Sequence, residues 1–191
     1  LASSLEVPND RVRYFPANPS SYTYLDGLRP VQPDPWQCDS FCVNTTLMTR
    51  KWRFAKPSSA ATTCPGYDEY GYGLSGPLPP YLTARGVPAM IKAFSTRDVT
   101  YLSGSSDVCD SPFMRDHDCT PSCNPDDGGL DTSCEAYIQG KCRMARAHAY
   151  AQYAREEKGF AMHRLVAIPH VGHSGCAVFQ SPEALEAMFP Q

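Results

Sequence analysis

The stretch "RLVAIPHVGHSGCAVF", residues 164 to 179, decides how the fold of this chain is interpreted. A short apolar strand runs into Gly172-His173-Ser174-Gly175, and a helix is expected to follow. A turn of this kind between strand and helix can present Ser174 as an attacking serine in a nucleophile elbow. Near the C-terminus of an α/β fold, the same turn can instead present His173 as a general base. The two interpretations exclude each other.

Length, charge and hydropathy exclude several classes of protein. A chain of 191 residues is long enough for one core, and a net charge of −3 with interspersed signs gives no basic surface for nucleic acid. The longest apolar run is broken by Arg164 and Pro169, so no membrane span is expected. Because the chain starts at Leu1 without a signal peptide, we expect it to be processed or part of a longer protein.

Nine cysteines predict a disulfide framework and an oxidising compartment, so we expect a secreted protein or one of the secretory lumen. Asn44-Thr45-Thr46 is an acceptor sequence for N-glycosylation and agrees with that location. Two CxxxC pairs, Cys38/Cys42 and Cys119/Cys123, leave zinc as an alternative, which the lack of a CxxC or of paired histidines disfavours. Because nine is odd, one thiol is free or bridges to another chain.

Three strands are expected, at 11–17, 98–104 and 162–169. Residues 18–95 are rich in Pro, Gly and Tyr, and their one convincing helical pattern lies around 40–54. A structureless stretch of that length is implausible inside a core, so it should pack over a sheet edge. Its tyrosines and tryptophans are equally compatible with a ligand-binding wall and with a private core for this segment.

The helical pattern is clearest at 132–157, where Thr132 and Glu135 have capping-box spacing and Gly159 follows the end. A short helix at 182–189 closes the chain. Strand, excursion, strand, loop, helix, strand and helix make an α/β order, whose strands should be parallel. Three parallel strands leave an open edge, so the sheet is expected to need further strands.

Side chains after the strands predict the site, because the carboxyl ends of parallel strands meet at one edge of the sheet. Asp107 follows the second strand and His173 the third, which is the order of acid and base in a Ser…Asp…His triad. Asp110 is an alternative acid, farther from the strand end. A histidine after a strand is also a common surface or capping residue, so the sequence alone leaves both interpretations open.

Ser174 does not fit the role of nucleophile. Cys176 stands where the elbow motif requires its second glycine. The 17 residues after Ser174 contain no histidine, and Glu183 and Glu186 are their only acids. An elbow serine would need an acid and a histidine after later strands, so His173 is the better candidate of the two.

Residues 108–130 form an acidic loop that carries three cysteines beside the predicted acid. A surface loop held by disulfides is one interpretation. Clustered carboxylates and Gly128-Gly129 make a calcium site the alternative, although the spacing does not match an EF-hand. No other cofactor and no metal ligand set is predicted.

Six blocks of the sequence resemble the C-terminal half of a group of esterase-like α/β-hydrolases. The blocks are "ANPSSYTYLDGLRP" (17–30), "CPGYDEYGYGL" (64–74), "LPPYL" (78–82), "DVTYLSGSSD" (98–107), "LDTSCEAYIQGKCRMARAHAY" (130–150) and "HRLVAIPHVGHSG" (163–175). The resemblance covers most of residues 11–189. It implies that Asp107 is the triad acid and His173 the triad base, while the elbow serine and the oxyanion-hole amides lie outside this chain.

The resemblance also implies a domain organisation. Residues 1–17 would be a helix end and a strand of the hydrolase core, 18–95 a cap, and 96–191 the C-terminal core with 108–130 inserted. The three strands would be the sixth, seventh and eighth of the standard sheet, completed by an N-terminal partner segment of the same hydrolase.

The expected function is therefore part of a secreted serine hydrolase that cleaves an ester or similar acyl bond. In this interpretation Asp107 orients His173, and His173 activates a serine outside the chain. The substrate is a small molecule or an acyl ester. The alternative is a non-catalytic hydrolase-like subunit with a structural or binding role in an extracellular or lumenal assembly.

Overall fold

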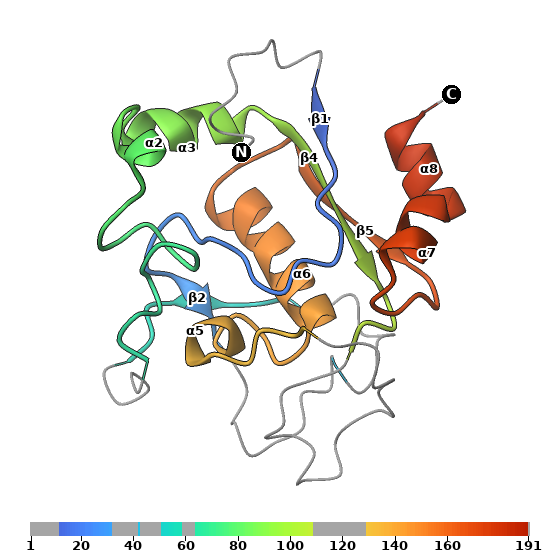
Figure 1. Ribbon diagram of the computed structural model, residues 1–191, viewed down its shortest axis with the longest axis horizontal. Helices are drawn as coiled ribbons and strands as arrows, with labels where there is room; N and C mark the ends of the chain where they lie inside the picture. The colour runs from blue at the N-terminus through green and yellow to red at the C-terminus, as the bar shows by residue number, and fades with distance from the viewer. Residues whose placement is uncertain (1–11, 32–41, 43–50, 59–63, 109–128, 191) are drawn as a thin grey trace, which may run out of the picture.

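A three-stranded parallel sheet forms the centre of the protein, with helices on both faces (Figure 1). The computed structural model describes residues 12–31, 42, 51–58, 64–108 and 129–190. The strands are β1 (Arg13–Tyr14), β4 (Asp98–Gly104) and β5 (His163–Ile168), in the spatial order β1-β4-β5. The predicted mixed α/β content and the parallel direction of the strands are confirmed.

The first strand is shorter than the predicted 11–17. Arg13 and Tyr14 pair with β4, and an isolated bridge joins Ala17 to Leu102 farther along. Between them, Pro16 has no amide hydrogen to give to a ladder, and its carbonyl oxygen accepts from the Leu102 amide at 2.9 Å. The strand therefore stays in contact with β4 while its regular pairing stops.

Side chains of the sheet alternate between two cores, as the pleat of a strand requires. Val99 and Tyr101 of β4 face α6 (Arg143–Gln152) and the π-helical turn η3 (Tyr153–Glu157) that continues it. Leu102 faces the opposite side, where α7 (Gly175–Gln180) and α8 (Pro182–Met188) pack. The C-terminal helix predicted at 182–189 is confirmed.

The single helix predicted at 132–157 is wrong, because the structure has two separate helices there. The first, α5 (Cys134–Tyr137), begins at Ser133, whose hydroxyl accepts from the Ala136 amide, so the cap is one residue later than the predicted Thr132. Gly140 then interrupts the chain with φ of 151°, and a Cβ there would lie 2.9 Å from the Arg146 nitrogen. The predicted end before Gly159 is confirmed by its φ of 70°.

The segment 18–95 contains more regular structure than the sequence predicts. Helices α2 (Pro80–Thr83) and α3 (Val87–Ser95) precede β4, and a proline lies in the first turn of each. The helical pattern around 40–54 is only partly correct. Cys42 is helical, but β3 (Phe54–Ala55) pairs antiparallel with β2 (Arg29–Pro30).

Two disulfides join this segment to the helical part of the chain, which confirms the disulfide prediction for four of the nine cysteines. Cys42 is bonded to Cys142, which directly precedes α6, and Cys64 is bonded to Cys134, the first residue of α5. Cys176 on α7 is a free, exposed thiol. Both bonds close long loops and therefore restrict the unfolded chain strongly.

Several predictions fall on residues outside the described part of the chain. These are the glycosylation site at Asn44, the alternative acid Asp110, Cys38, the helix end expected at the start of 1–17, and nearly all of the loop 108–130 with its cysteines and acids. Among the helices that the structure does describe, none has the length and hydropathy needed to cross a bilayer.

Candidate functional site

Asn18 forms hydrogen bonds that connect the carboxyl ends of the three strands. Its backbone amide donates to the Leu102 carbonyl at 2.9 Å, and its Oδ1 accepts from the Gly104 amide at 2.9 Å. Its Nδ2 donates to the carbonyl of Gly172 at 3.2 Å. Asn18 has φ of 43°, a conformation that asparagine tolerates better than most residues. One buried side chain therefore fixes how β1, β4 and the loop after β5 meet.

Gly104 lets the loop after β5 approach the end of β4. A Cβ at this position would lie 2.2 Å from the carbonyl oxygen of Val171 and 2.6 Å from that of Gly172. No side chain fits at that distance. The close approach brings the residue after Gly172, His173, to the residues that follow β4.

The structure brings Asp107 and His173 together, as their positions after neighbouring strands predict. Nδ1 of His173 lies 3.0 Å from Oδ2 of Asp107. The carboxylate is buried, while the imidazole side chain keeps 30% of its exposure. With the aspartate ionised, this hydrogen bond requires the proton on Nδ1 and leaves the lone pair on Nε2. Nε2 has no hydrogen-bond partner among the described residues.

Arg143 holds the other oxygen of the same carboxylate and was not predicted from the sequence. Its NH1 lies 3.3 Å from Oδ1 of Asp107, and both side chains are completely buried. Its Nε donates to the hydroxyl of Ser20 at 3.2 Å. A buried carboxylate needs such a partner to offset its loss of hydration. The available signal in the sequence was a cationic residue within the mostly apolar start of a helix.

The backbone of Asp107 is fixed on both sides. Its amide donates to the Gly104 carbonyl at 3.0 Å, and its own carbonyl accepts from the Met144 amide at 3.1 Å. The acid is thus attached to both the end of β4 and the first turn of α6. Hydrogen bonds connect the imidazole of His173 to the carboxylate of Asp107 and the carboxylate to the guanidinium of Arg143. His173 is the exposed end of this chain of groups, and its Nε2 can accept or release a proton.

Ser174 and His170 have structural positions in the same loop. The Ser174 hydroxyl accepts from the Ala177 amide at 3.3 Å and so caps α7. His170 is exposed, and its backbone amide donates to the Ser105 hydroxyl at 2.9 Å. Capping agrees with the exclusion of Ser174 as nucleophile.

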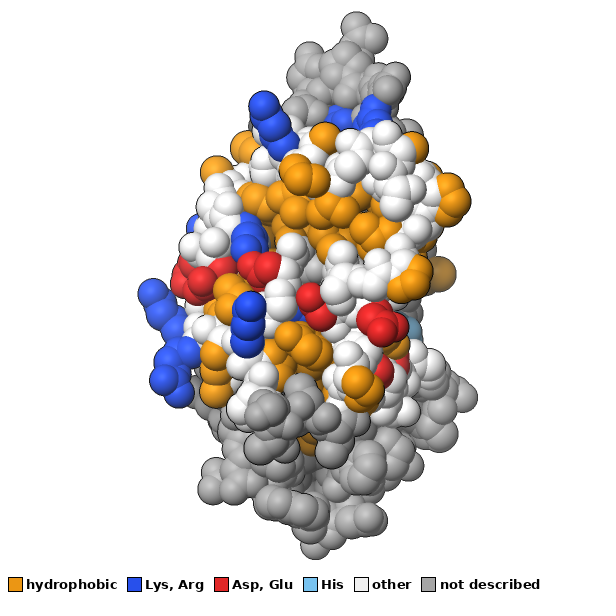
Figure 2. Space-filling model, turned by 90° about the vertical axis from the view of Figure 1, so that its left-hand side faces the viewer, with side chains coloured by type: hydrophobic (Ala, Val, Ile, Leu, Met, Phe, Trp, Pro, Cys, Tyr) orange, Lys and Arg blue, Asp and Glu red, His pale blue; other side chains and the backbone are white. Residues whose placement is uncertain are grey.

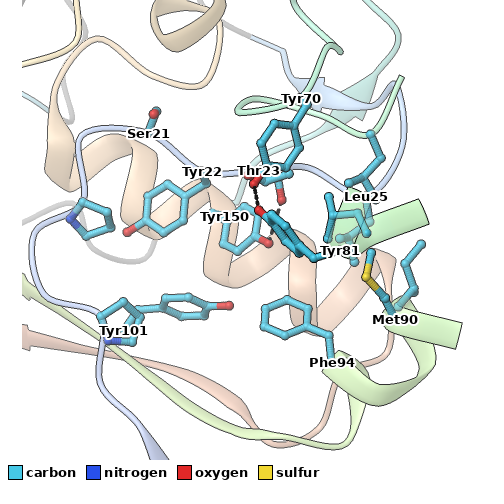
Figure 3. A pocket seen from close by; sticks show the side chains of 15 residues that line it. Ser21, Tyr22, Thr23, Leu25, Tyr70, Tyr81, Met90, Phe94, Tyr101 and Tyr150 are labelled. Atoms are coloured by element: carbon cyan, nitrogen blue, oxygen red, sulfur yellow. Dashed lines mark hydrogen bonds between the residues drawn. The ribbon is translucent and has the colours of Figure 1, made fainter. Parts of the chain in front are cut away.

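A second candidate site is an aromatic cavity of about 340 Å³ on the α6 side of the sheet. On the face shown in Figure 2, hydrophobic side chains gather in one broad area that charged side chains flank. Figure 3 shows Tyr22 and Tyr101 at one end of the cavity and Tyr81, Met90 and Phe94 at the other, with Tyr150 of α6 between them. Tyr22 lines this cavity and also packs in the common core with Tyr101 of β4 and Tyr150 of α6, so its core is not private to residues 18–95.

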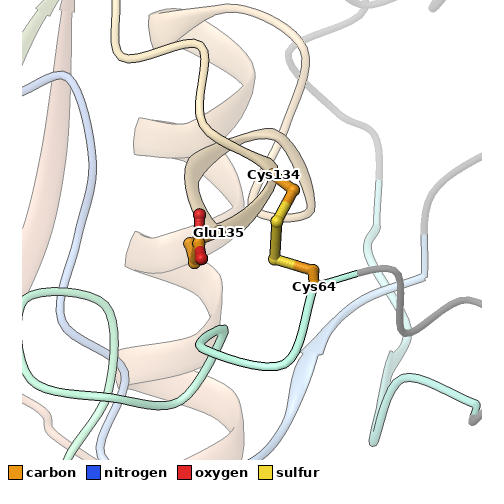
Figure 4. A group of neighbouring side chains, drawn as sticks. All are labelled: Cys64, Cys134 and Glu135. Atoms are coloured by element: carbon orange, nitrogen blue, oxygen red, sulfur yellow. A yellow bond between two sulfur atoms is a disulfide. The ribbon is translucent and has the colours of Figure 1, made fainter.

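A metal site is not supported by the cysteines that the structure describes. Figure 4 shows Cys64, Cys134 and Glu135, whose potential ligand atoms all lie within 4.8 Å of one another. The two sulfurs are bonded to each other and therefore offer no thiolate. Cys42, a member of one CxxxC pair, is likewise in a disulfide, so its predicted alternative role as a zinc ligand is wrong.

Two buried titratable groups outside the Asp107–His173 pair, those of His163 and Tyr101, belong to the core. His163 is fully buried, with Nδ1 2.9 Å from the Tyr101 hydroxyl and Nε2 3.1 Å from the Phe94 carbonyl. Burial lowers the pKa of His163 below its usual value. The pKa of Tyr101 is raised, first by burial and then by the neighbouring tyrosines. Both groups are therefore neutral at physiological pH.

No family model matches the chain, and neither the curated proteins nor the solved structures contain a significant match to it.

Proposed function

We propose that Asp107 and His173 are the acid and base of a serine-type α/β-hydrolase that cleaves an ester or similar acyl bond. The attacking serine is supplied by polypeptide outside these 191 residues. One observation carries the proposal. An acid and a histidine, each in the loop that follows one of two adjacent parallel strands, share a hydrogen bond of 3.0 Å at the carboxyl edge of the sheet.

The order of the strands supports the proposal. β1, β4 and β5 lie side by side in chain order and run parallel, as the last three strands of a hydrolase sheet would. Within the described residues, neither β1 nor β5 has a partner along its outer edge. Further parallel strands beside β1 would complete the sheet and place a nucleophile loop at the same carboxyl edge.

The chemistry follows from the hydrogen bonds. Nε2 of His173 takes the proton of the serine hydroxyl while its oxygen attacks the carbonyl carbon, and the imidazolium then protonates the leaving alcohol. An acyl-enzyme remains, and a water molecule activated by the same Nε2 releases the acid. Asp107 stabilises the imidazolium, and the buried Arg143 holds the carboxylate in place.

The experiment compares two histidines of one loop in the protein purified with its associated polypeptides. With p-nitrophenyl esters, His173→Asn should lower kcat/KM by about 10³-fold or more, because the general base is lost. His170→Asn changes an exposed histidine three residues away and should leave kcat/KM within about twofold. A serine-reactive fluorophosphonate should label the associated serine.

Equal activity of the two variants would refute the assignment of His173. Absence of ester turnover and of labelling in a folded, fully associated protein would favour the non-catalytic subunit instead.

We also propose that the protein is extracellular or lumenal. Two disulfides that bridge distant parts of the chain support this, because such bonds persist in oxidising compartments.

A further inference from the structure

The aromatic cavity lies apart from the Asp107–His173 pair. Its lining takes Tyr101 from the middle of β4, whereas the pair lies beyond Gly104 at the end of that strand. The other walls come from α2, α3 and α6, from the chain between residues 16 and 25, and from the loop at 70–74. Its position on the flank of the sheet makes it a separate site, independent of the proposed hydrolase activity.

The floor of the cavity is a set of tyrosine rings held by core packing. Tyr22 and Tyr150 are stacked with centroids 4.5 Å apart, and Tyr101 meets Tyr150 edge to face at 5.5 Å. All three residues are buried, so the rings are already ordered before a ligand enters. A preformed floor of aromatic faces and edges favours a flat aromatic molecule, which stacks on it at little cost in side-chain order.

The lining excludes a charged ligand. None of the side chains around the cavity is acidic or basic. An ion placed there would lose its hydration without gaining a counter-ion, which costs several kcal/mol or more. Met90, Ile91 and Leu82 contribute aliphatic surface on the helical side. The volume of about 340 Å³ lies near the lower end of the range for ligand pockets, and this fits a molecule of one or two rings.

The hydrogen bonds of the tyrosine hydroxyl groups determine where the cavity can offer a hydrogen-bond donor to a ligand. Tyr150 donates to the Thr23 carbonyl at 2.9 Å, and the Tyr101 hydroxyl is bonded to His163. Tyr70 and Tyr81, which are 42% and 52% exposed, lie on the solvent side and bond each other. Two hydroxyls that share one hydrogen bond use only one of their two protons, so the second can be donated to an acceptor at the mouth.

We propose that this cavity binds a neutral aromatic molecule that carries one hydrogen-bond acceptor. The ring system occupies the tyrosine floor between Tyr22, Tyr101 and Phe94. A carbonyl, ether or hydroxyl oxygen of the ligand accepts the free proton of the Tyr70–Tyr81 pair.

The test uses 6-propionyl-2-dimethylaminonaphthalene, a neutral two-ring ketone whose emission shifts to the blue in apolar surroundings. The wild-type protein, purified with its associated polypeptides, should bind it saturably at one site. Ile91→Trp places an indole in the cavity and should weaken binding at least about tenfold. Lys92→Trp puts the same residue on the next, exposed position of α3, outside the lining, and should change the affinity less than about twofold.

The acceptor is tested separately with the double variant Tyr70→Phe/Tyr81→Phe and with the 6-propyl analogue, which lacks the carbonyl. The double variant removes both hydroxyls of the pair and should weaken the ketone about fivefold, the worth of one ordinary hydrogen bond, and leave the analogue unchanged. Equal binding by the two tryptophan variants, or non-saturable binding by wild type, would overturn the proposal. A dimer of the chain that Ile91→Trp dissociates in sedimentation would overturn it too, because a second copy would then be the occupant.

Discussion

Replacing Arg143 by methionine tests the ion pair on which the candidate site depends. The substitution keeps the length of the side chain and removes the guanidinium from a position with no exposure. Asp107 is then left buried, with His173 as its remaining hydrogen-bonded side chain. Removing one partner of a buried pair costs about 3–5 kcal/mol. Because His173 still donates to the carboxylate, we expect the lower end, about 3 kcal/mol of unfolding free energy.

The control is a salt bridge of almost the same length whose arginine is half exposed. Arg164 lies 3.2 Å from Asp98, and its side chain keeps 44% of its exposure. Arg164→Met should cost less than about 1 kcal/mol, because water screens and replaces that interaction. Both variants are measured by urea unfolding at pH 7, with the change in midpoint converted through a common m-value.

A double substitution isolates the pairwise interaction. Asp107→Leu combined with Arg143→Met removes both charges, so the double variant should be more stable than Arg143→Met alone. Equal losses for Arg143→Met and Arg164→Met would refute the argument. So would a double variant whose loss is the plain sum of the single ones, because the two side chains would then be uncoupled.

Three further changes have defined outcomes. Gly104→Ala should lower stability by about 2 kcal/mol or more, seen as a fall of several degrees in Tm, because the new methyl group displaces Val171. Burial lowers the pKa of His163 from 6.5, so the unfolded chain takes up this proton at a higher pH than the folded protein does. The contribution of His163 to stability is therefore complete above pH 6.5 and declines as the pH falls below it. In urea titrations His163→Gln should flatten this decline, and an unchanged dependence of the unfolding free energy on pH would exclude the explanation. Cys42→Ser with Cys142→Ser opens a loop with a sequence separation of 100 and should cost about 4–5 kcal/mol in the same assay, whereas a loss under 1 kcal/mol would contradict the model of chain entropy.

The sequence predicted the strands and the pair at their ends because both depend on local patterns. The strand predicted at 98–104 is β4 to the residue, since its apolar run is bounded by Arg97 and ends at Gly104. Asp107 and His173 follow from the rule that loops after parallel strands share one edge of a sheet. None of these inferences requires knowledge of distant contacts.

Arg143 and Asn18 were missed because their positions depend on long-range geometry. The predicted continuous helix from 132 gave no way to place Arg143 relative to the sheet, and the interruption at Gly140 sets the actual start of α6. No sequence pattern marks Asn18 as important, and its role arises only where three chain segments meet. Likewise Phe54 was assigned to a helix, although it pairs with β2 across a separation that periodicity does not detect.

The Cys42–Cys142 bond ends one residue before Arg143, so assembly of the site is linked to the oxidation of these two cysteines. A newly made chain carries these two cysteines as thiols, and α6 then starts without its covalent link to the segment around Cys42. Formation of the bond restrains the backbone directly before Arg143, whose guanidinium holds Asp107. The geometry of the pair therefore depends on a covalent bond that forms after synthesis, and a chain with scrambled pairs lacks this restraint.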